Sequence, residues 1–115
     1  MTEQELMDAG FVDVCEESEV GAPLPKRVEV AGRGVLLGRD GDRVHAFDEI
    51  CPHENQLMRF AVVFGGEVTC PHHQYRFKLD TGRCNRRCAP LELFDVEVLD
   101  GRVWVRTSQD EWRDE

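Results

Sequence analysis

Two short stretches of this 115-residue chain place a cysteine, a proline and a histidine in a row. The first reads CPHEN, from Cys51 to Asn55, and the second reads CPHHQY, from Cys70 to Tyr75. Two thiolates and two imidazoles can form a tetrahedral zinc site, or they can hold an iron–sulfur cluster with both histidines on one iron. Structural zinc sites usually take ligands of one kind from each turn. Because each stretch here offers one cysteine and one histidine, the spacing favours the iron–sulfur cluster.

The elements that position these stretches are predicted to be short strands. Turn dipeptides separate the apolar runs at Asp40-Gly41, Gly65-Gly66 and Asp100-Gly101, as expected for hairpins, because Asp and Gly tolerate a positive φ. The fold is therefore expected to be all-β, with small antiparallel sheets. The alternating runs contain Val28 and Val30, Val35 and Leu37, Val44 and Ala46, Phe94, Val96 and Val98, and Val103 and Val105.

Residues 48–60 and 70–90 break the strand pattern and hold most of the cysteine and histidine. Long loops inside a compact domain usually carry function. We therefore expect a β base, 11–47 with 91–106, that carries an inserted loop-rich cluster-binding subdomain at about 48–90. The domain is predicted to span 11–105, between an acidic N-terminal extension at 1–10 and an acidic C-terminal tail at 106–115. Thr2 and Glu5 form a capping box for one short helix that Gly10 could end.

The net charge of −9 is concentrated at the two ends of the chain. Residues 1–20 contain seven acids and no base, whereas the middle of the chain is neutral. This balance argues against nucleic acid as a partner, because nucleic-acid binding needs a basic footprint. The chain has no apolar run long enough to span a membrane and no secretion signal, so we expect a cytoplasmic protein whose cysteines stay reduced.

The pattern C-x-H, sixteen residues, C-x-x-H resembles the Rieske [2Fe–2S] motif. The resemblance extends over roughly residues 11–105 and implies a Rieske-type fold with one [2Fe–2S] cluster. It implies that Cys51 and Cys70 hold one iron, and that His53 and His73 hold the other. Because the second loop of the motif requires C-x-x-H, His73 is the expected ligand and His72 is not. The chain departs from the family at two positions where glycine is common, which here are Asn55 and Gln74.

The resemblance also indicates a low reduction potential. High-potential Rieske proteins of respiratory complexes join the two loops by a disulfide, and His72 stands where the second of its cysteines would be. Those proteins place a serine after the second loop's histidine as a donor to sulfur, whereas Gln74 and Tyr75 follow here. Fewer donors stabilise the reduced state less. The potential is therefore expected in the low part of the Rieske span of roughly −150 to +300 mV.

The chain is similar to soluble Rieske ferredoxins that carry one electron from a flavin-dependent reductase to a terminal oxygenase. This resemblance implies a monomer with transient partners and no catalytic residue of its own. An oxygenase would need a further iron site with two histidines and a carboxylate, and only His45 and His72 remain after ligation. The alternatives are a permanently bound electron-entry subunit of a larger oxidoreductase, a zinc-bound structural module, or a redox sensor suggested by Cys84, Cys88 and His72.

Several other residues near the two loops have predicted roles. Arg86 and Arg87 are hypothesised to dock on carboxylates of a partner, because the resemblance places Pro90 in a loop that covers the cofactor. His72 and Tyr75 are further candidates for contacts around the cofactor. Cys15 is predicted to be a core residue, and Cys84 and Cys88 are predicted to be thiols. The residues predicted to be core or to shield the cofactor are Leu57, Phe60, Val62, Phe64, Phe77, Leu79, Leu91 and Leu93.

Overall fold

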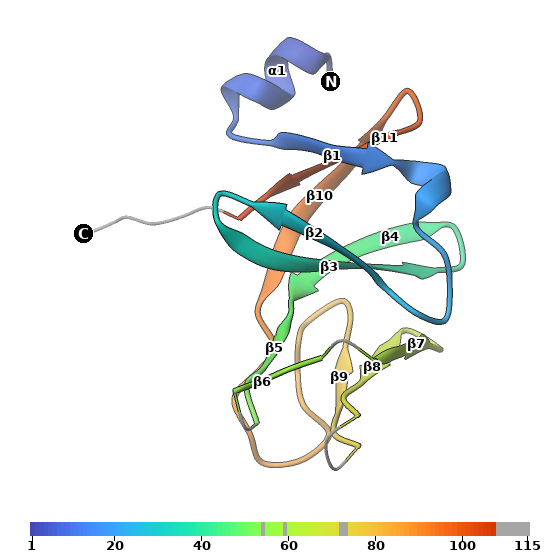
Figure 1. The fold of residues 1–115 in the computed structure, drawn as a ribbon, viewed down its shortest axis with the longest axis vertical. Coiled ribbons are helices and arrows are strands. Elements are labelled where there is room, and N and C mark those ends of the chain that lie inside the picture. Colours follow the sequence, from blue (N-terminus) through green and yellow to red (C-terminus); the bar gives the residue numbers. More distant parts are fainter. Residues whose placement is uncertain (54, 59, 72–73, 108–115) are drawn as a thin grey trace, which may run out of the picture.

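Antiparallel strands dominate the computed structural model of this chain, which describes residues 1–53, 55–58, 60–71 and 74–107 (Figure 1). The predicted all-β fold of small antiparallel sheets is confirmed. No helix within the described ranges is long and apolar enough to cross a membrane. The elements are α1 (Glu3–Asp8), β1 (Val12–Glu16), the 3-10 turn η1 (Glu17–Glu19), β2 (Lys26–Val30), β3 (Arg33–Asp40), β4 (Arg43–Asp48), β5 (Ile50–Cys51), β6 (Gln56–Leu57), β7 (Val62–Phe64), β8 (Glu67–Thr69), β9 (Arg76–Lys78), β10 (Leu93–Leu99) and β11 (Arg102–Arg106).

Six of these strands form the base, one sheet in the order β1-β11-β10-β4-β3-β2, which occupies the upper part of Figure 1. The three predicted hairpin turns are confirmed, with positive φ at Gly41, at Gly65 and Gly66, and at Asp100 and Gly101. Because side chains alternate across a strand, each apolar run sends one set of residues inward. That set forms the base core, which contains Cys15, Val20, Val30, Val35, Leu37, Val44, Ala46, Phe94, Val103 and Val105.

Strand β3 is buried on both of its faces. Val35 and Leu37 point into the base core, whereas Leu36 belongs to a second core on the other side. A continuous apolar run is typical of a strand covered on both sides. Gly38 permits a close approach there, because a Cβ atom at that position would lie 2.8 Å from Cγ2 of Val63 in β7. The base and the inserted subdomain are therefore packed against each other through β3.

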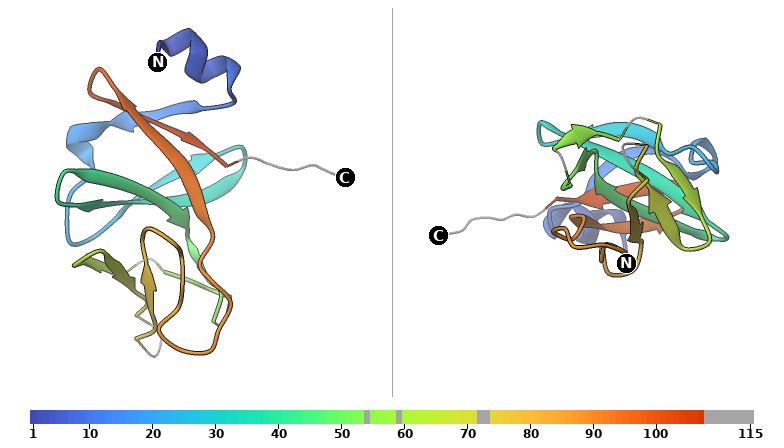
Figure 2. Two further views of the ribbon diagram at one scale, coloured as in Figure 1. Left: turned by 180° about the vertical axis from the view of Figure 1, so that it is seen from behind. Right: turned by 90° about the horizontal axis from the view of Figure 1, so that it is seen from below.

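The residues between β4 and β10 form the second, smaller part of the molecule (Figures 1 and 2). Strands β5 and β6 make a two-stranded sheet, and β7, β8 and β9 make a three-stranded sheet. Residues 52–55 connect β5 to β6, residues 70–75 connect β8 to β9, and residues 79–92 connect β9 to β10. The side chains inside form the site core, which contains Leu36, Phe47, Cys51, Met58, Ala61, Val63, Val68, Cys70, Phe77, Leu79 and Leu91.

The predicted N-terminal helix is confirmed as α1. The Thr2 side chain accepts a hydrogen bond from the Glu5 backbone N–H, and the Glu5 carboxylate accepts one from the Thr2 N–H, which is a capping box. A helix of six residues needs packing to be stable. Leu6 supplies it, because its buried side chain packs with Phe11 and Trp104 of the base.

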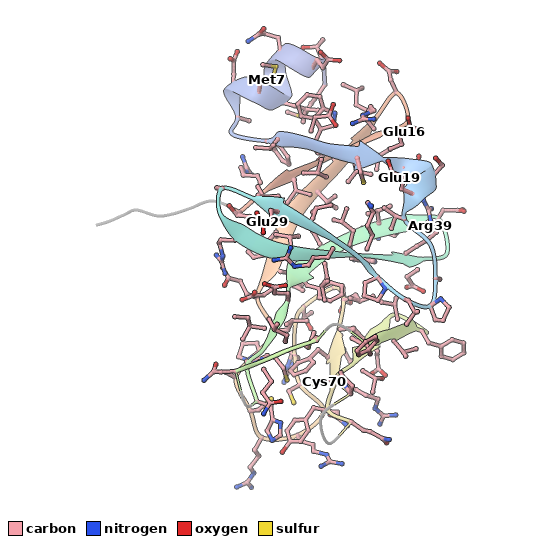
Figure 3. The ribbon with its side chains drawn as sticks, viewed as in Figure 1. Met7, Glu16, Glu19, Glu29, Arg39 and Cys70 are labelled. Carbon is pink, nitrogen blue, oxygen red and sulfur yellow. The ribbon has the colours of Figure 1, made fainter. Side chains whose placement is uncertain are left out.

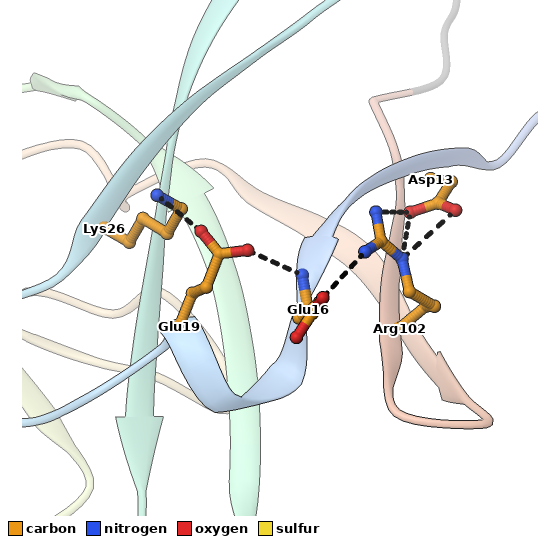
Figure 4. Close-up of polar contacts among 5 residues, drawn as sticks. All are labelled: Asp13, Glu16, Glu19, Lys26 and Arg102. Carbon is orange, nitrogen blue, oxygen red and sulfur yellow. Dashed lines mark hydrogen bonds and ion pairs between the residues drawn. The ribbon is translucent and has the colours of Figure 1, made fainter.

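A chain of polar contacts links the two edge strands of the base (Figure 4). Arg102 in β11 pairs with Asp13 in β1 at 2.9 Å, and Lys26 in β2 pairs with Glu19 in η1 at 3.2 Å. Glu16 joins the two pairs, because its backbone N–H donates to the Glu19 carboxylate and its own carboxylate lies 3.8 Å from the Arg102 guanidinium. Exposed ion pairs each contribute roughly 0–1 kcal/mol, so these contacts orient the edges more than they stabilise the sheet.

Four of the apolar residues predicted to be core or shielding are exposed instead, so the core prediction is wrong for them. Phe60 and Phe64 are 75% and 82% exposed, and Leu57 and Val62 are about half as exposed as these. The cause in β7 is alternation, since Val63 points into the site core and therefore Val62 and Phe64 point outward. The prediction is confirmed for Phe77, Leu79 and Leu91, which are buried, and Leu93 packs against them.

Candidate iron–sulfur site

The first loop, residues 51–55, connects the short strands β5 and β6. Cys51 ends β5 opposite Gln56, and the Asn55 backbone N–H donates to the Cys51 carbonyl at 2.7 Å. Asn55 has a φ of +57°, a conformation that asparagine tolerates better than most residues with a Cβ atom. The tight turn thus forms without the glycine that the family commonly has there.

The second loop, residues 70–75, connects β8 to β9. The Cys70 backbone N–H donates to the Tyr75 carbonyl at 2.7 Å and closes the loop at its base. Gln74 has a φ of +56°, so this loop also contains a left-handed residue where the family commonly has glycine. His72 and the predicted ligand His73 lie outside the described residues.

The two loops that carry the four predicted ligands lie against each other. The side chains of Cys51 and Cys70 are fully buried in the same apolar core. Figure 3 shows Cys70 inside the lower part of the molecule. The His53 ring of the first loop stacks on the Tyr75 ring of the second, with centroids 3.6 Å apart and an interplanar angle of 19°. Two buried thiols that share one core and an imidazole from the first loop are donors of the types that a [2Fe–2S] centre with mixed ligation uses.

A third loop, residues 80–92, runs beside the second. Asn85 forms two hydrogen bonds with Arg76, because its Oδ1 accepts from the Arg76 N–H and its own N–H donates to the Arg76 carbonyl, both at 2.9 Å. The loop is closed at its base where the Leu91 N–H donates to the Gly82 carbonyl. Gly82 has a φ of +79°, and a Cβ atom there would collide with the Leu91 carbonyl oxygen.

The third loop contributes two sulfur atoms and a guanidinium to the surroundings of the site. Cys84 and Cys88 are thiols, as predicted, and both pack against the site core. Burial, together with the neighbouring Cys84 thiol, raises the pKa of Cys88 to about 12. The Arg86 guanidinium lies over the Tyr75 ring, 4.8 Å from its centroid. Arg87 and Pro90 are exposed on the same loop.

Sequence reasoning missed Asn85, which joins the second and third loops. The available signal was weak, because asparagine in a loop often bonds to backbone groups, but the sequence does not say which ones. Sequence reasoning also missed Glu49, two residues before the first loop. Its carboxylate accepts a hydrogen bond from Arg27 of β2 at 2.7 Å and occupies the space above Gly34 of β3.

Comparisons with known proteins agree with this geometry. A ferredoxin component of the alkene monooxygenase system of Xanthobacter autotrophicus is 30% identical over 102 residues, which cover 87% of this chain and 84% of that protein. The structure resembles the ferredoxin of carbazole 1,9a-dioxygenase from Nocardioides aromaticivorans IC177, with 29% identity, a TM-score of 0.76, and coverage of 85% of this chain and 98% of that one. It also resembles a chain in a complex of reduced oxygenase and oxidized ferredoxin in carbazole 1,9a-dioxygenase, with 27% identity, a TM-score of 0.78, and coverage of 88% and 96%.

The family assignment rests on the whole domain and not on the short motif alone. The family model described as the Rieske [2Fe–2S] domain matches residues 10–97, which include both loops and the strands that hold them. The buried thiols and the stacked imidazole supply ligands of the kind that such a domain uses. The chain therefore belongs to the Rieske [2Fe–2S] domain family, and one [2Fe–2S] cluster is its cofactor.

Proposed function

We propose that this protein is a one-electron carrier that accepts electrons from a flavin-dependent reductase and passes them to a terminal oxygenase. The observation that carries the proposal is the near-complete overlap with ferredoxin components, since the matched region covers 84% or more of each of the three proteins compared above. One of them is a ferredoxin seen together with its oxygenase. A carrier needs a cofactor near one end of a small protein, and the two loops provide such a place at the end of the subdomain away from the base (Figure 1).

The proposed ligands are Cys51 and Cys70 for one iron and His53 and His73 for the other. The cofactor supplies reversible one-electron chemistry when it is bound. The site core keeps water away from the two cysteine side chains, whose accessible surface is zero. His53 is half-buried in the first loop, and neutral imidazoles bring less negative charge to their iron than thiolates would. These features support electron entry and exit at the histidine side of the cofactor.

The reduction potential is proposed to lie in the low part of the Rieske range. His72 occupies the position where high-potential relatives have a disulfide cysteine, so a bridge between the loops cannot form there. Tyr75 stands where those relatives have a serine that donates to sulfur, and its ring is instead stacked on His53. With fewer donors to the sulfurs, the reduced state is less stabilised and the potential is lower.

Potentiometric EPR titration of protein produced with iron tests the cofactor, the ligand type and the potential together. We expect a rhombic Rieske-type signal that appears on reduction at low potential. A signal at high potential would contradict the argument about sulfur donors. Zinc in place of iron, with no such signal, would contradict the electron-transfer function and favour a structural module.

A second measurement separates a mobile carrier from a permanently bound subunit. The proposed carrier is a cytoplasmic monomer whose partners bind transiently. When it is co-expressed with its neighbouring genes and purified, the holoprotein should therefore elute at the mass of one chain. Stable copurification of an oxygenase or reductase subunit would support the permanently bound alternative.

Docking is proposed to use the basic third loop. Arg86 and Arg87 are exposed there, whereas acidic side chains are concentrated in residues 1–20. Charges at the rim of an interface mainly change the association rate and its salt dependence. Arg87→Glu should therefore slow second-order transfer to the oxygenase at low salt, and Arg43→Glu on the exposed start of β4 serves as the matched control. Equal rates for the two variants would count against docking at this loop.

A further inference from the structure

Three side chains from three different loops form one stack beside the proposed site. His53 comes from the first loop, Tyr75 ends the second, and Arg86 lies in the third. The imidazole and phenol rings are nearly parallel at 3.6 Å, and the guanidinium lies 4.8 Å from the centre of the phenol ring. We refer to these three residues as the ring stack.

The position of Arg86 in the ring stack is anchored by its neighbours. Asn85 is hydrogen-bonded twice to the backbone of Arg76, which directly follows Tyr75. The Arg86 backbone N–H donates to Sγ of Cys84, and the Cys88 N–H donates to the Arg86 carbonyl. The backbone on both sides of Arg86 is therefore fixed relative to β9, the strand that directly follows Tyr75. Arg87, the next residue, has no ring contact among the described residues and is exposed.

We infer that Tyr75 and Arg86 tune the reduction potential of the cofactor: Tyr75 holds the plane of the His53 imidazole, and Arg86 supplies a positive charge at the Tyr75 ring that is stacked on that imidazole. This inference rests on the ligand assignment proposed above. Guanidinium remains protonated at every physiological pH, and its contact with an aromatic face is favourable. An electron added to the cofactor is attracted by this charge, so Arg86 stabilises the reduced form and raises the potential.

The two residues have separable roles. Tyr75 is half-buried and covers one face of the imidazole, so it excludes water from that face and fixes the ring plane. Arg86 is exposed and acts through its charge, so its effect should weaken as salt screens it. Tyr75 is therefore a positioning residue that acts on the cofactor through His53, whereas Arg86 acts on it electrostatically.

The test is the midpoint potential of the holoprotein, measured by EPR without any partner protein. Arg86→Gln should lower the potential relative to wild type, and the shift should be larger at low salt than at high salt. Arg87→Gln, which removes the same charge one residue away, should shift the potential by less than half as much. Arg86→Lys should retain part of the effect, because the charge stays while the planar contact is lost.

A double-mutant cycle tests whether Arg86 acts through the stack. In a Tyr75→Leu background, Arg86→Gln should shift the potential less than it does in wild type, because the ring that aligns the guanidinium is gone. Tyr75→Leu should also change the EPR g-values, because the plane of the His53 ring is no longer held, whereas Tyr75→Phe should keep both g-values and potential close to wild type.

The outcomes distinguish failure of this inference from failure of the proposed function. If wild type shows a Rieske signal but Arg86→Gln and Arg87→Gln shift the potential equally, the inference is wrong and the ligand assignment stands. An equal shift from Arg86→Gln with and without Tyr75 would also overturn it. If wild type shows no Rieske signal, both proposals fail. Arg86 and Arg87 are exposed, so their single variants should fold and keep the cofactor. Their comparison is made with Tyr75 in place, so it stays informative even if Tyr75→Leu loses its cofactor.

Discussion

The two loops that carry the predicted ligands begin with the same three residue types, but different parts of the molecule hold them. The first loop is tied to the base. Glu49, just before it, accepts a hydrogen bond from Arg27 of β2, and its N–H donates to the Gly34 carbonyl of β3. Asp48 is bound to the base as well, since it pairs with Arg33 at 3.3 Å. Contacts with the six-stranded sheet therefore fix the position of the first loop.

The second loop has its supports inside the small subdomain. Arg76, which follows it, is bound at both its N–H and its carbonyl by Asn85 of the third loop. Lys78 is bound to the same loop, because its N–H donates to the Arg83 carbonyl. The position of the second loop thus depends on the third. Equivalent ligands in the two loops should consequently respond differently when their surroundings are changed.

The largest effect is expected from the ligands themselves, where the two loops should behave alike. His53→Ala and His73→Ala should each abolish the Rieske EPR signal, because each removes one of two imidazoles from the same iron. His72→Ala should keep the signal and the iron content, and it is the matched control at the adjacent position. Loss of the signal in His72→Ala but not in His73→Ala would reverse the ligand assignment of the second loop.

A smaller effect, confined to the second loop, is expected from Asn85→Ala. The change removes the acceptor of the Arg76 N–H, and an intramolecular hydrogen bond contributes about 1 kcal/mol. The apparent Tm of the holoprotein should fall by roughly 4 °C, and the cofactor should be lost faster. Asn85→Asp retains an acceptor oxygen and should remain close to wild type.

Arg27→Gln is the corresponding test at the first loop. It breaks the contact with Glu49, but the Glu49 backbone bond to Gly34 and the Asp48 pair with Arg33 remain. Its effect on Tm and on the rate of cofactor loss should therefore be smaller than that of Asn85→Ala. If Arg27→Gln has the larger effect, the proposed difference in support between the two loops is wrong.

The sequence predicts the strands and turns of this fold because their signals are local. Alternating apolar residues and the Asp-Gly and Gly-Gly dipeptides depend only on near neighbours in the chain. The ring stack could not be predicted in this way, since it depends on which residues of three separate loops meet in space. The exposure of Phe60 and Phe64 shows the same limit, because residue type indicates an apolar side chain but not the face on which it lies.

The smallest expected effect compares the left-handed residue of each loop. Asn55 and Gln74 have nearly the same φ, +57° and +56°, and both are exposed. This conformation costs a residue with a Cβ atom about 1–2 kcal/mol, and asparagine less, because its short polar side chain can hydrogen-bond locally. Glycine removes that cost but loses roughly 0.5–1 kcal/mol more conformational entropy on folding.

Gln74→Gly should therefore stabilise the holoprotein by about 0.5–1 kcal/mol, because the strain that it removes exceeds the entropy that it adds. Asn55→Gly should be close to neutral, because less strain is present to remove. The apparent Tm, measured for both variants at one heating rate, should rise by roughly 2–4 °C for Gln74→Gly and change little for Asn55→Gly. A larger increase in Tm for Asn55→Gly would mean that the backbone of the first loop is the more strained of the two, despite the contacts that hold this loop on the base. The six-stranded sheet would then fix the position of the first loop without lowering its backbone strain.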